Sequence, residues 1–175
     1  MNSALNELKI RADLILARAR RGEPPVLARL AGLPPFQKVD QALCAEQVQR
    51  KHALWLVARE YGFRTWNQAR DVLLGSGTEA DFGTMLMVKG CGGYLNNWYA
   101  GHDQAAACRR QTGGFLLAYR RQFLVVGADY IDSMGLDWDD PDWKAIGRDW
   151  ARPDDLAARG RLYGRLIARR KRELD

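Results

Sequence analysis

The chain has 175 residues, of which 47% are apolar and 27% charged. This is enough for one folded domain or two small ones, and it excludes an extensively disordered chain. No run approaches the roughly eighteen apolar residues that span a bilayer, and Met1–Arg21 lacks the continuous apolar stretch of a secretory signal. We therefore expect no contact with a membrane and a cytoplasmic location.

The net charge of +6 is unevenly distributed along the chain. Residues 1–75 carry twelve Lys/Arg against seven Asp/Glu, residues 76–158 carry eight against twelve, and residues 159–175 carry seven against two. Basic ends therefore flank an acidic middle. Two interpretations are open: the basic ends attract phosphate groups or acidic proteins, or the acidic middle pairs with the flanks within the fold.

Helical periodicity dominates the first 75 residues. Apolar residues recur at three- and four-residue steps in segments bounded by Gly and Pro. The predicted helices are Asn2–Arg21, Pro25–Ala31, Val39–Cys44, Glu46–Tyr61 and Trp66–Leu74. We expect Gly62 to end the fourth helix in the left-handed conformation and Thr65 to cap the fifth. The Trp66 side chain is expected to fold back and fill the angle between these two helices.

The second half mixes strands and helices. Runs rich in aromatic and β-branched residues predict strands, which are Met85–Val88, Tyr94–Tyr99, Phe115–Tyr119 and Gln122–Val126. The predicted helices are His102–Gln111, Ala128–Met134, Pro141–Asp149 and Pro153–Arg172. The sequence therefore predicts an α+β fold: a helical N-terminal unit (1–75) packed on a small β-sheet with surrounding helices (76–175). The linker between them is short, so we expect one body.

Two resemblances add to this interpretation. The segment "VQRKHALWLVAREYGFRTWNQARDVL" (Val48–Leu73) resembles the helical segment that flanks bacterial ankyrin-repeat proteins and accompanies some glyoxalase-superfamily proteins. The stretches "CGGYLNNW", "GGFLLAYRRQFLV" and "DWDDPDWKAIGRDW" make most of the chain similar to a family of uncharacterised proteobacterial proteins. The first resemblance implies a helical pair without known catalytic residues, and the second implies a shared fold without a function.

Motifs for cofactor and metal chemistry are missing from the sequence. No glycine cluster is followed by the Gly-Lys-Ser/Thr of a phosphate loop, and the acidic run at residues 137–142 fails the glycine position of a calcium loop. We expect this run to cap the next helix through Asp139 or Asp140. Neither a cofactor nor a metal site is therefore predicted. Cys44, Cys91 and Cys108 show no CxxC spacing and are predicted to be free thiols.

The sequence offers one candidate nucleophile–base pair and one candidate ligand pocket. Cys91 in a glycine-rich turn and His102 at a helix start are weak candidates for a catalytic pair. Period-two alternation places either Tyr94, Asn96 and Trp98 or the intervening residues on the inner face of a strand. In the first register Asn96 and Trp98 would form a polar-aromatic pocket, bordered by Tyr119 and Gln122 from the following hairpin.

Exposed arginines define the candidate partner surface. A standard helix-turn-helix is a poor match, because Gln68 stands where the second helix needs a buried aliphatic side chain. A looser electrostatic mode would use guanidinium groups for phosphates and aromatic rings for bases. The candidate residues are Arg64, Arg70, Arg120, Arg121, Arg165, Arg169 and Arg170. We therefore predict a non-enzymatic binding or regulatory protein with a nucleic-acid or acidic-protein partner. The alternative is a small-molecule binder or enzyme that uses the polar-aromatic pocket.

Overall fold

A computed structural model of the chain describes residues 3–76, 81–87, 94 and 96–174, with side chains up to residue 170. In this part of the chain the helices are α1 (Ser3–Arg20), α2 (Pro24–Ala31), the 3-10 helix η1 (Pro34–Phe36), α3 (Gln41–Gln47), α4 (Arg50–Glu60), α5 (Trp66–Leu74), α6 (His102–Thr112), α7 (Ala128–Ser133), α8 (Pro141–Ala145) and α9 (Leu156–Leu174). The strands are β1 (Asn97–Tyr99), β2 (Phe115–Tyr119) and β3 (Gln122–Val126). The predicted α+β class is confirmed.

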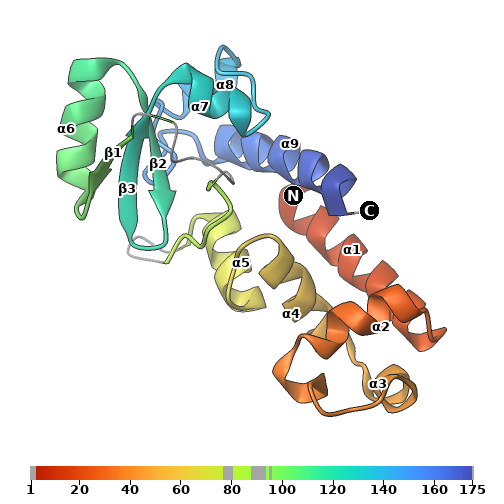
Figure 1. Ribbon diagram of the computed structural model, residues 1–175. Helices are drawn as coiled ribbons and strands as arrows, with labels where there is room; N and C mark the ends of the chain where they lie inside the picture. The colour runs from red at the N-terminus through yellow and green to blue at the C-terminus, as the bar shows by residue number, and fades with distance from the viewer. Residues whose placement is uncertain (1–2, 77–80, 88–93, 95, 175) are drawn as a thin grey trace.

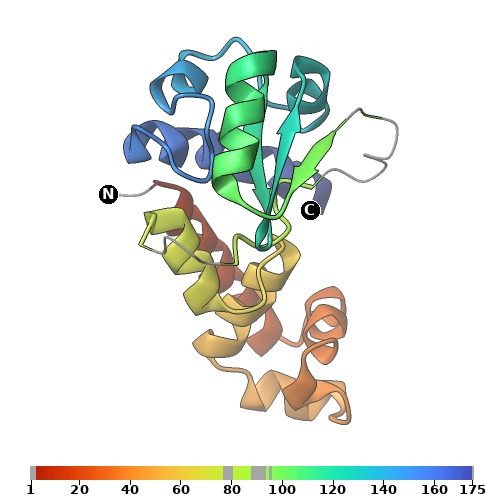
Figure 2. The ribbon, with the colours of Figure 1, turned by 90° about the vertical axis from the view of Figure 1, so that its left-hand side faces the viewer.

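The strands form an antiparallel sheet of order β1-β3-β2, with helices on both faces (Figures 1 and 2). The register pairs Trp98 with Leu124 and Tyr119 with Gln122. Because side chains alternate across a strand, these four side chains share one face. The opposite face packs Leu116 and Val125 against alanines of α6. The face that carries Trp98 and Leu124 joins the main core with α7, α8 and α9 (Figure 1).

The helical unit and the sheet unit share one hydrophobic core. A single cluster of buried side chains runs from Leu8 of α1 through Val57 of α4 to Leu117 of β2 and Ile167 of α9. The α9 helix connects the two halves, because it packs on α1, α5 and α8. Arg159 of α9 is 2% exposed and donates to the carbonyl groups of Val72 and Trp150, both at 3.1 Å. None of the described helices has both the length and the apolar character to cross a membrane.

Several predicted helix ends are confirmed by their capping contacts. The Thr65 hydroxyl accepts a hydrogen bond from the Gln68 N–H at the start of α5. At the start of α8, the Asp140 carboxylate accepts from the Asp142 N–H. Gly62 follows α4 with a φ of +88°, in the left-handed region that favours glycine. The hairpin of β2 and β3 also has its predicted bounds.

Two predicted strands are wrong in whole or part. Residues 84–87 form a turn closed by the Met87 N–H and the Thr84 carbonyl at 3.1 Å, whereas Val88 lies outside the described residues. Met85 and Leu86 are buried in the core without strand pairing, because apolar character fixed their burial but not their backbone conformation. The strand predicted from Tyr94 is limited to the three residues of β1.

Two predicted helices are also wrong in their extent, and the helices predicted as Val39–Cys44 and Pro153–Arg172 lie two or three residues later, as α3 and α9. The segment Glu46–Tyr61 is split between α3 and α4, because the buried Val48 has an extended backbone (ψ 129°). Gln49 is the N-cap of α4, and its N–H donates to the His52 ring. The segment Pro141–Asp149 ends as helix at Ala145, since Gly147 and Arg148 both have positive φ. Residues 148–150 instead run beside β2: the Leu116 N–H donates to the Arg148 carbonyl, and the Trp150 N–H donates to the Leu116 carbonyl.

Trp66 is less buried than expected. It is only partly buried against the core, whereas Phe63, in the joint between α4 and α5, is 2% exposed and belongs to that core. Removal of the Trp66 side chain therefore costs less than the roughly 3–5 kcal/mol of a fully buried tryptophan.

The thiols are expected to differ in reactivity. Cys44 and Cys108 are free, and Cys44 is 2% exposed. Burial raises the pKa of the Cys44 thiol, and the thiolate is the reactive form. In a Cys91→Ser background, a thiol reagent should therefore modify Cys108 first and Cys44 only slowly, which mass spectrometry of the peptides measures. Equal rates in denaturant provide the control, and faster native modification of Cys44 would contradict the expectation.

Candidate anion-binding site

One pocket among the described residues lies where three chain segments meet. Its volume is about 230 Å³, and it is lined by Arg59, Gly62, Phe63, Arg64, Asp81, Gly83, Thr84 and Arg120. The first four residues come from the end of α4 and the joint before α5, the next three from the segment that follows the helical unit, and Arg120 from the β2–β3 turn. We call this set the arginine pocket. It brings together two of the arginines predicted from the sequence, Arg64 and Arg120.

Close contacts join the Gly62 and Gly83–Thr84 segments of the pocket lining, and we call these joined segments the floor of the arginine pocket. The Thr84 N–H and hydroxyl both donate to the Gly62 carbonyl, at 2.8 and 3.2 Å. A Cβ on Gly62 would lie 2.7 Å from the Thr84 hydroxyl oxygen, and one on Gly83 would lie 2.6 Å from the Gly62 carbonyl oxygen. Both glycines also have positive φ. These positions therefore require glycine for conformation and for space.

The hairpin tip is fixed to this floor by a pair of backbone hydrogen bonds. The Arg120 N–H donates to the Gly83 carbonyl at 2.7 Å, and the Phe82 N–H donates to the Arg120 carbonyl at 2.9 Å. Arg120 has a φ of +52°, which is uncommon for a residue with a side chain. Strained backbone is concentrated at functional sites, where the surrounding structure holds it. The contacts thus hold a strained arginine at the wall of the pocket.

Among the described residues, the arginines of the pocket have no carboxylate partner. Arg59 donates to the Gly32 carbonyl at 3.2 Å, and the Arg120 guanidinium lies 5.5 Å from the centre of the Tyr119 ring. Within the described ranges neither they nor Arg64 forms an ion pair. The one acid of the pocket, Asp81, accepts from the Gly83 N–H at 2.9 Å. Three cationic groups and one anionic group therefore give the pocket a formal charge of +2.

The Tyr119 ring lies beside Arg120, and the Trp98 ring packs against Tyr119. The Trp98 and Tyr119 rings meet edge to face, with centroids 5.7 Å apart and planes at 90°. Trp98 remains 42% exposed, which leaves indole surface available to solvent. We call these two residues the aromatic ledge. The predicted pocket residues Trp98, Tyr119 and Gln122 thus share one face of the sheet, and Asn96 precedes β1 with a buried side-chain oxygen that has no hydrogen-bond partner among the described residues.

The other predicted arginines are placed differently. Arg121 is exposed next to Arg120 in the hairpin turn. Arg70 pairs with Asp71 at 3.0 Å. On α9 the Arg169 guanidinium packs against Gly135, and Arg170 donates to the Met85 carbonyl at 3.1 Å. These α9 contacts hold the fold together and do not extend the arginine pocket.

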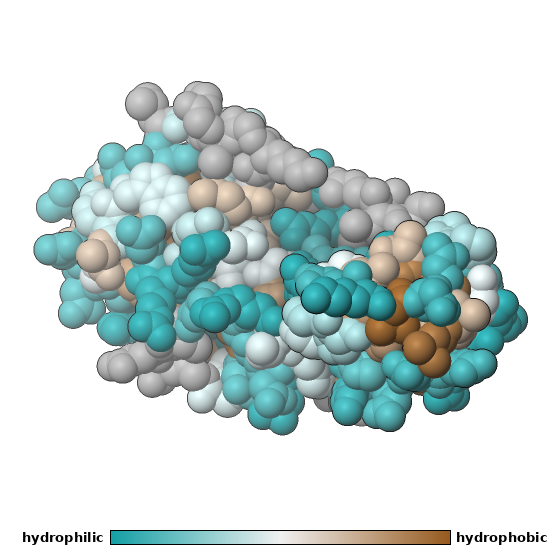
Figure 3. Space-filling model, turned by 60° about the horizontal axis from the view of Figure 1, so that its bottom comes forward, coloured by the Kyte–Doolittle hydropathy of each residue, from teal (hydrophilic) through white to brown (hydrophobic). Residues whose placement is uncertain are grey.

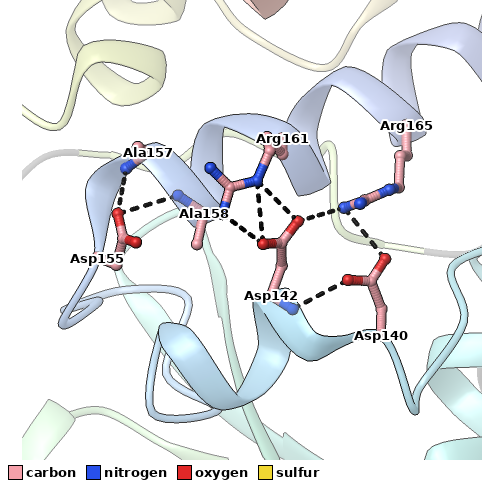
Figure 4. A network of polar contacts seen from close by, with 7 residues as sticks. All are labelled: Asp140, Asp142, Asp155, Ala157, Ala158, Arg161 and Arg165. Atoms are coloured by element: carbon pink, nitrogen blue, oxygen red, sulfur yellow. Dashed lines mark hydrogen bonds and ion pairs between the residues drawn. The ribbon is translucent and has the colours of Figure 1, made fainter.

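Arg165 belongs to an ion-pair network between α8 and α9 (Figure 4). Asp142 accepts hydrogen bonds from Arg161 and Arg165, and Asp140 pairs with Arg165 at 3.1 Å. The acidic middle of the sequence therefore pairs with the basic C-terminal segment here, as one of the two charge interpretations proposed.

His102 is oriented by a carboxylate that the sequence did not point to. Its Nε2 lies 2.6 Å from Asp149 Oδ2, and both side chains are about one-tenth exposed. The other Asp149 oxygen accepts from the N–H groups of Ala151 and Arg152. His102 Nδ1 lies 3.5 Å from Asp103, so both ring nitrogens face carboxylates. This arrangement ties α6 to the loop after α8, and Cys91 lies outside the described residues.

Other surface features do not converge on a second site. The face in Figure 3 is mainly hydrophilic, with a hydrophobic patch toward the end of the molecule opposite the sheet. Where the structure describes the chain, no three His, Cys, Asp or Glu side chains form a group that could hold a metal ion. Comparison of the chain with protein-family models, curated proteins and solved structures gives no match. The two family resemblances therefore stay predictions.

Of the eight residues that line the arginine pocket, only Arg64 and Arg120 were predicted from the sequence as site residues. Arg59 lies three residues before the glycine that ends α4, and a basic residue in a last helical turn usually serves the helix dipole. Asp81, Gly83 and Thr84 fall in a short segment between the units, where no periodicity marks them. An arginine turn such as Arg120-Arg121 was the one local signal for an exposed cationic group.

Proposed function

We propose that this protein is a non-enzymatic binding protein whose partner is single-stranded nucleic acid. The observation that carries the proposal is the adjacency of the arginine pocket and the aromatic ledge. Guanidinium groups that lack carboxylate partners suit phosphates. An exposed indole beside them suits an unpaired base, because every base has a face that can stack. Such stacking contributes about 1–3 kcal/mol per base.

This combination favours nucleic acid over an acidic protein. An acidic peptide would use the guanidinium groups of Arg64 and Arg120, but its carboxylates offer no aromatic ring to stack on Trp98. Tyr119 links the two groups, since its ring lies 5.7 Å from the exposed Trp98 ring and 5.5 Å from the Arg120 guanidinium. The polar-aromatic pocket expected from the sequence thus serves the same binding surface in this proposal.

We expect short single-stranded oligonucleotides of mixed sequence to bind with an affinity that falls steeply with salt. Each phosphate contact releases counterions, so the slope of log K against log salt is about −0.7 per contact for single strands. Fluorescence anisotropy between about 50 and 200 mM salt measures it. Arg120→Ala should weaken binding and flatten this slope. Trp98→Ala should weaken binding about five- to 150-fold, the equivalent of one lost stack, and should leave the slope unchanged.

Arg110→Ala is the matched control. Arg110 is an exposed arginine of α6, on the helix that covers the opposite face of the sheet, so its removal changes the net charge equally without touching the pocket. Circular dichroism verifies that each variant is folded. Absence of binding at low salt, or an Arg110→Ala loss as large as that of Arg120→Ala, would overturn the proposal. Binding of poly-glutamate but of no oligonucleotide would assign the pocket to an acidic protein.

A further inference from the structure

We infer that the arginine pocket binds the terminal phosphate of a nucleic-acid strand in preference to an internal phosphate. This inference rests on the proposed function and adds the part of the partner that enters the pocket. Its first support is charge. Arg59, Arg64 and Arg120 against Asp81 leave the pocket at +2. A phosphate monoester carries about −1.5 to −2 at neutral pH, whereas an internal diester carries a single negative charge. The pocket charge therefore matches a strand end.

The second support is the closed floor. A strand that contributes an internal phosphate must leave the pocket on both sides of that phosphate. Here Gly62 and Gly83 approach too closely to admit even a methyl group between them, and the Thr84 N–H binds the Gly62 carbonyl across the floor. A strand therefore cannot pass between these two segments of the lining. An end fits this shape with one bond to the rest of the chain.

The third support is size. About 230 Å³ is less than the roughly 300–1,000 Å³ of sites that enclose a whole small ligand. The space suits a phosphate and part of its sugar, with the rest of the strand outside. The hairpin tip then directs the strand, because Arg120 contacts Tyr119, which in turn contacts the exposed Trp98. The end nucleotide can place its phosphate in the pocket while a neighbouring base stacks on the aromatic ledge.

The test uses one oligonucleotide sequence with three kinds of end: 5′-phosphate, 3′-phosphate and hydroxyl at both ends. Anisotropy competition should show about tenfold tighter binding of one phosphorylated form than of the hydroxyl form, as expected for one added charge-assisted contact. The two phosphorylated arms tell which end enters. Arg64→Ala should abolish the preference. Trp98→Ala should weaken all three ligands by the same factor, because the ledge contacts a base and not the end.

The outcomes separate this inference from the proposed function. Equal binding of all three oligonucleotides by the wild-type protein would overturn the terminal-phosphate inference and leave nucleic-acid binding standing. Binding of none would overturn both. A preference that survives Arg64→Ala, or one that Arg110→Ala also removes, would show that the pocket does not read the end. Equally tight binding of a singly phosphorylated peptide would show that the pocket reads phosphate monoesters without the nucleic acid.

Discussion

Replacement of Gly62 by alanine should destabilise the protein by about 2–5 kcal/mol. A side chain in the left-handed conformation costs about 1–2 kcal/mol, and Gly62 has a φ of +88°. In addition, the new Cβ would lie 2.7 Å from the Thr84 hydroxyl oxygen and 2.9 Å from the Met85 nitrogen. Relief of such contacts in a packed interior costs about 1–3 kcal/mol more. Chemical denaturation followed by circular dichroism measures the sum.

Gly22→Ala separates the two contributions. Gly22 also has a positive φ, of +75°, but its Cβ would meet no atom within 4 Å. It should therefore lose only the conformational part, about 1–2 kcal/mol. A clearly larger loss at Gly62 shows that the contact between the α4–α5 joint and the segment at Thr84 holds the two units together. Equal losses in the two variants would show that this contact contributes nothing.

Local signals predicted the elements well where the physical cause is itself local. A hydroxyl three residues before an N–H predicts a cap, as at Thr65, and a carboxylate two residues before an N–H does so at Asp140. The hairpin around Arg120-Arg121 was also predictable, because two aromatic and β-branched runs lie two residues apart. Prediction failed at Met85 and Leu86, where apolar residues are buried without a strand. A short apolar run is typical both of a strand and of a buried segment without strand pairing, so the pattern does not distinguish them.

The arginine pocket could be predicted only in part, because its residues are adjacent through the fold. Arg64 and Arg120 were candidates for a partner surface as single exposed residues. Their meeting depends on the Arg120 N–H bond to the Gly83 carbonyl, which joins two units that the sequence treats separately. Arg165 was likewise predicted as a partner-binding cation, because its carboxylate partners Asp140 and Asp142 lie at the start of another helix and are distant in the sequence. The unpaired arginines became distinguishable from the paired ones only in three dimensions.

The ion-pair network of Figure 4 should make the protein sensitive to acid. Hydrogen bonds from Arg161, and then from Arg165, hold the pKa of Asp142 below its usual range against the opposing effect of burial. Because the folded-state pKa is below the unfolded value of about 4, the network stabilises the fold fully above about pH 5 and loses this contribution as the pH falls through the folded pKa. Asp142→Asn should remove that part of the pH dependence.

At neutral pH, Asp142→Asn should lower the free energy of unfolding by about 1.5–3 kcal/mol, the usual contribution of hydrogen bonds to a charged group. Asp142 is only 8% exposed, although its arginines are half exposed, so water replaces the lost contacts poorly. Asp13→Asn is the matched control: Asp13 binds Arg50 with similar geometry, but both side chains are about half exposed, and such surface pairs contribute little. Denaturation of the three proteins at several pH values decides the matter. If Asp142→Asn and wild type lose stability in parallel as the pH falls, other carboxylates carry the acid sensitivity and the junction of α8 and α9 depends on its apolar contacts.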